Sequence, residues 1–211
     1  MSRPRPWVIV PGIWDSGPDH WQSVWQRERQ DRHHPQDRQD PHDPQDPQQH
    51  RAPAVRIAPA SWSEPDPDDW RAAISRAVAA CPGPPVLIAH SLGVLAVADW
   101  LASTTDAPDR VAGAFLVAPP DPLGGPFPAE ASGFAAPRPV PAGRQVPTRL
   151  VVSDDDPYCS ADRALAFAQV MGAQSVRIGA LGHVNVASGV GPWPAGRALL
   201  RTFEDGIRPP R

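Results

Sequence analysis

Lysine is absent from this chain, because all 20 of its basic residues are arginine. Without a lysine amine the protein cannot form a Schiff base with a carbonyl substrate, and a Ser-Lys catalytic pair is excluded as well. Alanine, proline, glycine and arginine are all abundant. We therefore interpret the missing lysine as a bias of composition that says little about mechanism.

Cysteine and long apolar runs are also scarce. The two cysteines, Cys81 and Cys159, are too few for a disulfide framework and lack a metal-ligand spacing. The first apolar run, residues 7–10, is too short for the apolar part of a signal peptide, and no segment approaches membrane-spanning length. A net charge of -3 gives no reason to expect nucleic acid or an anionic membrane as partner. We expect a soluble cytoplasmic protein.

One segment, residues 30–53, consists almost wholly of Asp, Arg, His, Gln and Pro, with Ala52 as its only other apolar residue. Such a segment cannot bury enough surface to offset its ordering entropy. Its four histidines among aspartates leave metal binding as an alternative, but we favour a disordered, solvated insertion. The length of 211 residues otherwise fits one domain, 1–211, with a substantial core.

Outside this insertion, short apolar runs alternate with helical patterns. Two of the runs, residues 86–89 and 113–117, are unbroken, as is typical of strands that are buried on both faces. We predict an α/β fold, a mostly parallel sheet with helices on both faces. The predicted strands are residues 7–10, 55–58, 86–89, 111–117, 149–152 and 175–178, and the predicted helices are residues 18–30, 67–80, 92–103, 161–171 and 194–203.

Ser91 stands where a buried strand turns directly into an apolar helix. Such a turn exposes the hydroxyl to substrate, and the small residues Ala89 and Gly93 on either side relieve crowding. An acidic loop and then a histidine loop follow later in the chain. The order serine, acid, histidine is that of the α/β-hydrolase triad and differs from the order in chymotrypsin-like and subtilisin-like proteases.

The acid should lie in the loop after the strand at 149–152, where Asp154, Asp155 and Asp156 stand together. We favour Asp156, because the residue before a proline is held extended and away from the following helix. The alternative is that these aspartates cap the helix beginning near Ser160, and we expect this of one of them, with Asp162 sharing the task.

Two of the seven histidines are candidates for the base. Four others lie in residues 30–53, and His90 sits beside the serine on the wrong side of the backbone. Of the remaining two, His20 and His183, we favour His183, because it follows the final strand in a glycine-containing loop.

The oxyanion that forms during acyl transfer needs two backbone donors. The amide of Leu92, at the start of the helix after Ser91, should be one of them. The loop after the first strand should supply the other through Ile13, with Trp14 as the alternate, although an ordinary turn at Pro11-Gly12 would explain the same residues.

Five blocks of sequence resemble the small serine hydrolases related to retinoblastoma-binding protein 9. They are Val-Pro-Gly-Ile-Trp-Asp-Ser-Gly-Pro-Asp-His-Trp-Gln at 10–22, Ala-His-Ser-Leu-Gly at 89–93, Val-Ala-Pro-Pro-Asp at 117–121, Ser-Asp-Asp-Asp-Pro-Tyr at 153–158 and Gly-His-Val-Asn at 182–185. The resemblance implies a three-layer α/β-hydrolase-like fold without a substantial cap domain, and the triad Ser91, Asp156 and His183. It also implies that Asp15, Ser16, His20 and Trp21 form a wall of the site.

We expect a serine hydrolase that cleaves a small ester, thioester or related acyl substrate, with no metal and no cofactor. The alternative is a protein-interaction module that keeps the fold, since the chain has eight tryptophans and aromatic side chains anchor interfaces. Four tryptophans fit helix cores, whereas three stand in loops and are candidates for the pocket rim. The candidate substrate-binding residues are Trp14, Asp15, His20, Trp62, Asp121 and Trp193.

Overall fold

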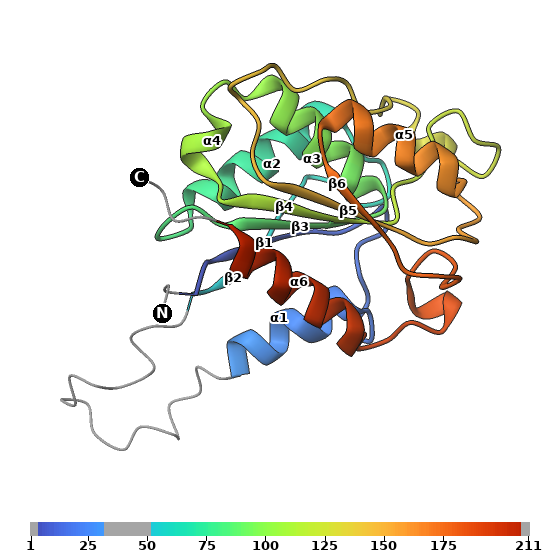
Figure 1. The fold of residues 1–211 in the computed structure, drawn as a ribbon, viewed down its shortest axis with the longest axis horizontal. Coiled ribbons are helices and arrows are strands. Elements are labelled where there is room, and N and C mark those ends of the chain that lie inside the picture. The colour runs from blue at the N-terminus through green and yellow to red at the C-terminus, as the bar shows by residue number, and fades with distance from the viewer. Residues whose placement is uncertain (1–3, 32–51, 208–211) are drawn as a thin grey trace.

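The computed structural model describes residues 4–31 and 52–207 of the chain. Its centre is one six-stranded sheet in the order β2-β1-β3-β4-β5-β6, with every neighbouring pair parallel (Figure 1). The strands are β1 Trp7–Val10, β2 Ala54–Arg56, β3 Val86–His90, β4 Gly113–Val117, β5 Thr148–Val152 and β6 Gln174–Arg177. The predicted parallel sheet is confirmed.

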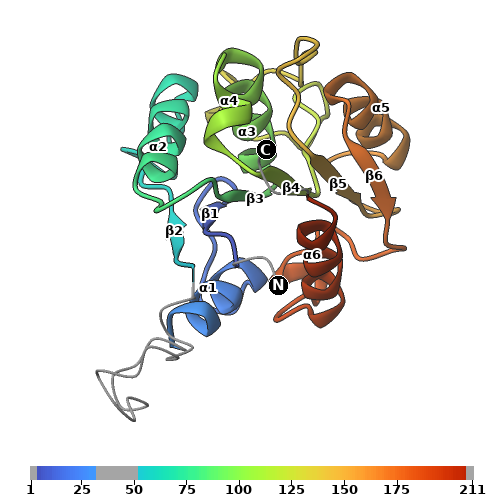
Figure 2. The same cartoon turned by 60° about the vertical axis from the view of Figure 1, so that its left-hand side comes forward.

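Helices cover both faces of this sheet, so that the fold has three layers (Figure 2). Helices α1 and α6 lie on one face, and α2, α3, α4 and α5 lie on the other. The helices are α1 Trp21–Asp31, α2 Pro67–Ala79, α3 Leu92–Ser103, α4 Ala107–Arg110, α5 Ala161–Met171 and α6 Pro194–Gly206, with single 3-10 turns at Ala129–Ala131 and Val186–Ser188. The predicted three-layer α/β fold is thus confirmed.

The sandwiched sheet explains the unbroken apolar runs of the central strands. Successive side chains of a strand point to opposite faces, and here both faces are covered. In β1, Trp7 and Ile9 pack with α1 and α6, whereas Val8 and Val10 pack with the helices of the other face. All four side chains are fully buried.

Several element boundaries differ from those predicted by up to three residues, and two of these differences have a clear structural cause. The fourth strand begins at Gly113, because the amide of Val111 still bonds to the Ala107 carbonyl at the end of the short helix α4. Helix α1 begins at Trp21, because a turn from Gly17 to His20 precedes it. This helix continues to Asp31, so the predicted insertion at 30–53 starts with helical residues, and its part at 32–51 lies outside the described residues.

The strand order places the candidate site at a change of direction in the sheet. From β1 the chain moves outward to β2 and then returns to the other side of β1 as β3. In open parallel sheets, ligands bind beyond the carboxyl ends of the strands at such a switch point. The loop after β1 and the turn after β3 meet at this place.

The long connection between β4 and β5 carries little regular structure. Between residues 118 and 147, all of which are described, the only helical segment is the 3-10 turn Ala129–Ala131. No cap domain is inserted above the sheet in the described residues, in agreement with the expectation. None of the described helices combines the length and apolar character that a membrane crossing requires.

Candidate active site

Ser91 lies in a strained turn between β3 and α3. Its backbone has φ 54° and ψ -128°, which a residue with a side chain rarely adopts. The turn brings α3 so close to β1 that a Cβ on Gly93 would lie 2.4 Å from the carbonyl oxygens of Val10 and Pro11. A side chain at position 93 therefore requires α3 or the loop after β1 to move, whereas Ala89, on the strand side, is accommodated in full burial.

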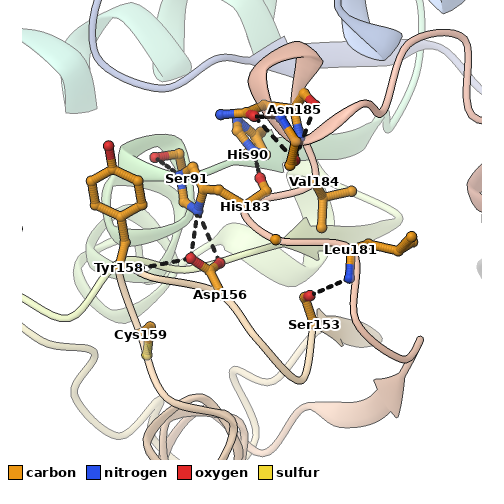
Figure 3. A network of polar contacts seen from close by, with 12 residues as sticks. His90, Ser91, Ser153, Asp156, Tyr158, Cys159, Leu181, His183, Val184 and Asn185 are labelled. Carbon is orange, nitrogen blue, oxygen red and sulfur yellow. Dashed lines mark hydrogen bonds and ion pairs between the residues drawn. The ribbon is translucent and has the colours of Figure 1, made fainter.

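The structure brings Ser91, His183 and Asp156 together, although they come from three loops (Figure 3). The Nε2 atom of His183 lies 2.8 Å from the Ser91 Oγ, and its Nδ1 atom lies 2.9 Å from both carboxylate oxygens of Asp156. The side chains of His183 and Asp156 are only 8% and 3% exposed. The contacts have the order nucleophile, base and orienting acid that acyl transfer requires.

The three adjacent aspartates of the β5 loop have different partners. Asp154 pairs with Arg177 on β6, and Asp155 accepts the amide of Gly182 at 2.7 Å. This amide, together with the Ser153 hydroxyl, holds the pKa of the Asp155 carboxyl below its usual value. Only Asp156 contacts the histidine ring.

The expectation that one of these aspartates caps the next helix is wrong. The N-cap of α5 is Ser160, whose side chain accepts the amide of Arg163. Asp154 and Asp155 instead connect the β5 loop to β6 and to the histidine loop, which a sequence reading of cap preferences could not show.

The histidine loop is held by side chains at four successive residues. The amides of Leu181 and Gly182 donate to Ser153 and Asp155, at 3.0 and 2.7 Å. The carbonyls of His183 and Val184 accept from other elements. The donors to these carbonyls are His90 Nε2 at 2.8 Å and Trp21 Nε1 at 2.9 Å. After the loop, Asn185 and Ser188 form a reciprocal capping box, so Asn185 satisfies local backbone groups as we expected.

Two backbone amides are available to stabilise an oxyanion near Ser91. Within the described residues, neither the amide of Leu92 nor that of Ile13 donates a hydrogen bond to a protein atom, and both residues line the cavity. The amide of Trp14, the alternate, already donates to the Trp62 carbonyl at 2.8 Å. The geometry therefore favours Ile13 over Trp14 as the second donor.

The hydroxyl of Ser91 opens into a cavity of about 230 Å³. Three of the candidate substrate-binding residues, Trp14, Asp15 and His20, line it, and so does Ser16. Trp14 is 60% exposed at this cavity. The other lining side chains are mostly apolar and include Ile13, Leu92, Pro120, Phe127, Pro128 and Tyr158.

Three other candidates do not line the cavity. Trp193 is buried against α1, where it stacks on Trp25, and Gly196 leaves the space for its ring. Trp62 packs edge-on against Trp70 in the core and reaches the site only through its carbonyl oxygen.

Asp121, the third of them, is paired with Arg163 at 3.1 Å and accepts the amide of Leu123. Trp21, which the resemblance placed in a wall of the site, is fully buried and does not line the cavity. The sequence does not show whether a side chain turns toward the cavity or toward the core, and the structure does not place Trp62, Asp121, Trp193 or Trp21 among the residues that line this cavity.

His90 and Tyr158 are contacts of the base that the sequence did not identify. The ring centroids of His90 and Tyr158 lie 4.9 and 4.5 Å from that of His183. Tyr158 also donates its amide to Asp156 at 2.9 Å. The position of Tyr158, two residues after the acid, was the available signal, because a carboxylate commonly accepts an amide two residues on.

Two further imidazoles beside the triad are held neutral. Burial, the Arg56 guanidinium and His183 lower the pKa of His20 to about 4, against an opposing effect of Asp15. Burial, His183 and His20 hold the pKa of His90 well below its usual value. In residues 4–31 and 52–207 no three His, Cys, Asp or Glu side chains gather as metal ligands would.

Comparisons with known proteins agree with this geometry. The serine hydrolase family model matches residues 36–202 of the chain. A YdeN-like hydrolase from Pectobacterium atrosepticum is 32% identical, with a TM-score of 0.73 over 97% of this chain and 92% of that one. Among curated proteins, none matches the chain.

Two more distant solved structures share the fold. The ydeN gene product of Bacillus subtilis is 17% identical, with a TM-score of 0.70 over 96% of this chain and 100% of that one. An esterase from a Rhodococcus species is 15% identical, with a TM-score of 0.58 over 97% of this chain and 91% of that one. At these identities the likeness concerns the fold alone.

Proposed function

Because the chain belongs to the serine hydrolase family, we propose that it cleaves a small ester, thioester or related acyl substrate through an acyl-enzyme on Ser91. The observation that carries the proposal is the unbroken hydrogen-bonded series from Asp156 through His183 to the Ser91 hydroxyl. A serine hydroxyl is a weak nucleophile unless a positioned base removes its proton, and this series provides that base.

In the first half of the reaction, the Ser91 Oγ attacks the substrate carbonyl carbon while its proton passes to His183 Nε2. Asp156 holds the Nδ1 proton and so fixes the tautomer that can accept at Nε2. The negative charge on the carbonyl oxygen is stabilised by the amides of Leu92 and Ile13. The bond to the leaving alcohol or thiol then breaks, and His183 returns the proton to it.

In the second half, a water molecule attacks the acyl carbon and gives a proton to His183. The carboxylic acid leaves as the bond to Ser91 breaks, and the proton returns to the Ser91 hydroxyl. Water, the substrate and the three side chains account for every bond and proton in this cycle, and no oxidant or reductant takes part.

The size of the cavity supports a short acyl group. Its volume of about 230 Å³ is below the range of about 300–1,000 Å³ that is common for pockets of drug-sized ligands. The apolar lining from Ile13, Leu92 and Phe127 suits an alkyl chain. The esterase named above supports ester cleavage only by likeness of fold.

Kinship with the hydrolases related to retinoblastoma-binding protein 9 belongs to the same proposal, on the five sequence blocks. The same proposal describes the protein as a single-domain cytoplasmic enzyme that uses no cofactor. It acts on a small molecule and has no nucleic acid or membrane partner.

The interaction module is the weaker alternative. Of the eight tryptophans, Trp14 alone is strongly exposed, and it belongs to the cavity.

A cysteine nucleophile is also disfavoured, because burial raises the pKa of the Cys159 thiol, beside the acid loop, to about 12.

The test is labelling with a fluorophosphonate probe, which reacts with activated serines. We expect the wild type to be labelled and Ser91→Ala to remain unlabelled, while Ser63→Ala, at an exposed serine outside the site, is labelled like the wild type. Equal labelling of Ser91→Ala would contradict the assignment. Turnover of nitrophenyl esters of increasing acyl length then measures the substrate preference, with an expected decline for long chains.

A further inference from the structure

His90 connects the strand of the nucleophile to the loop of the base. It is the last residue of β3, directly before Ser91, and its side chain is buried with 5% exposure. Its Nε2 atom lies 2.8 Å from the backbone carbonyl oxygen of His183 (Figure 3). No other donor among the described residues bonds to this oxygen.

The chemistry of this contact allows one arrangement. A carbonyl oxygen can only accept, so the proton of the His90 ring must be on Nε2. The ring is also packed in place, with its centroid 4.7 Å from that of His20 and 4.9 Å from that of His183, and edge-on to Trp21. Burial disfavours a second proton on the ring, so it remains a neutral donor.

The histidine loop needs such a contact. Gly182 and Val184, the neighbours of His183, have φ of 52° and 49°, in the left-handed region. For Val184, a β-branched residue, this conformation is strained and persists only where the surroundings hold it. The bond from His90 acts on the carbonyl of His183, which stands between these two residues.

We propose that His90 is a positioning residue, whose bond to the His183 carbonyl places the imidazole at the Ser91 hydroxyl. The proposal rests on the proposed function, because it assumes that His183 is the base. Since His90 and Ser91 are consecutive, one strand end sets the places of both the nucleophile and the base. His90 itself exchanges no proton in the reaction.

The experiment compares His90→Gln and His90→Leu. The Gln side chain can place an amide N–H near the position of the imidazole Nε2, whereas Leu fills a similar volume and donates nothing. A displacement of about 1 Å in a catalytic group can reduce the rate about 100-fold. We expect His90→Leu to lower kcat on a short nitrophenyl ester by about 10- to 100-fold, with a much smaller change in KM, and His90→Gln to recover most of the loss.

The matched control is Thr148→Val, which removes another buried hydrogen bond from a side chain to a backbone carbonyl, that of Val146 at 3.0 Å. Thr148 begins β5, at the end of the strand away from the acid loop. This variant should lower stability and leave kcat unchanged. If His90→Leu does not fold, His90→Asn replaces it, because its shorter amide keeps the polarity without reaching the carbonyl. Equal kcat in the wild type, the Leu or Asn variant and the Gln variant would refute the proposal.

A second measurement is independent of turnover. The Nδ1 proton that His183 shares with Asp156 gives a strongly downfield NMR signal when the ring is held in place. We expect this signal in the wild type and in His90→Gln, and its broadening or loss in His90→Leu. A wild type that fails to react with fluorophosphonate would refute the proposed function, and the NMR comparison would then decide on His90 alone. Signals that are identical in all variants would refute the positioning role.

Discussion

At the scale of the residue, the site depends on how adjacent carboxylates divide their tasks. Asp155 and Asp156 are consecutive, yet one bonds the backbone of the histidine loop and the other bonds the histidine ring. Asp156 also accepts a hydrogen bond from the amide of Tyr158, and this bond helps to orient the carboxylate toward the His183 ring. The residue before Pro157 is restricted to extended conformations, and this restriction keeps Asp156 clear of α5.

Replacing Asp156 by Asn should reduce kcat by about 10³–10⁴-fold, because an amide can stabilise the wrong tautomer of the base and carries no charge. The matched control is Asp154→Asn in the same loop, which removes only an exposed ion pair with Arg177. Steady-state kinetics on one ester should show a large loss for the first variant and near wild-type kcat for the second. Equal kcat in the two variants would contradict the role of Asp156.

The sequence was sufficient to bring forward the three triad candidates, because chain order and loop position constrain them strongly. It was not sufficient for the walls of the cavity. Trp193 and Trp14 both stand in loops, but one is buried against α1 and the other is exposed at the cavity. That difference depends on packing against Trp25 and Gly196, neither of which lines the cavity.

At the scale of the element, the close approach of α3 to the end of β1 creates the site. The first turn of α3 presents the Leu92 amide, and the loop after β1 presents that of Ile13. A Cβ on Gly12 would lie 2.9 Å from the Cβ of Ser91, so the loop runs directly beside the nucleophile. The distance between the two amides is thus set by the contact of a helix with a strand end.

Gly93→Ala tests this contact. The added Cβ would meet two carbonyl oxygens of β1 and its loop at 2.4 Å, so either α3 or the loop must move. We expect a loss of about 1–3 kcal/mol in the free energy of unfolding, as for overpacked cores. We also expect a loss of activity, since the Ile13 amide moves with the loop.

Gly206→Ala, in the last turn of α6, is the matched control, because a Cβ there meets nothing within 4 Å. It should be neutral or slightly stabilising. Thermal unfolding and ester hydrolysis measure both effects. A Gly93→Ala variant with the stability and kcat of Gly206→Ala would show that the contact is not tight.

Most of the elements could be predicted from the sequence, because buried parallel strands and capped helices have strong local patterns. Helices α3 and α5 have the predicted bounds. Helix α4 was missed, since a single turn of four residues carries no periodicity. The strand β4 was predicted two residues too long for the same reason, because that turn holds the amide of Val111.

At the scale of the whole molecule, the site combines loops from four strands of one sheet edge. The loops after β1, β3, β5 and β6 contribute the proposed oxyanion donor, nucleophile, acid and base. The sequence predicts this edge once the sheet is known to be parallel, because all carboxyl ends of its strands then lie together. It does not predict that the tilted rings of His20 and His90 contact each other beside His183, since that contact joins residues 70 positions apart.

The burial of these two imidazoles makes the stability of the whole fold sensitive to acid. His20 has a pKa of about 4 in the folded protein, below its usual 6.5. Between these values the unfolded chain binds a proton that the folded protein does not, so stability rises with pH across this window. The contribution of neutral His20 to the free energy of unfolding is complete above about pH 6.5 and is lost as the pH falls toward 4. Burial of His90 acts in the same direction.

We therefore predict that urea unfolding gives a lower free energy of unfolding at pH 5 than at pH 7.5, with a share of about 2 kcal/mol from His20. At pH 5 the Asp155 carboxyl, with its lowered pKa, remains ionised and so adds nothing to the difference between the two pH values. His20→Gln, which cannot take up a proton when the chain unfolds, should reduce the difference between the two pH values by that amount. If the variant kept the full wild-type difference, the buried neutral state of His20 would not be the cause of the acid sensitivity.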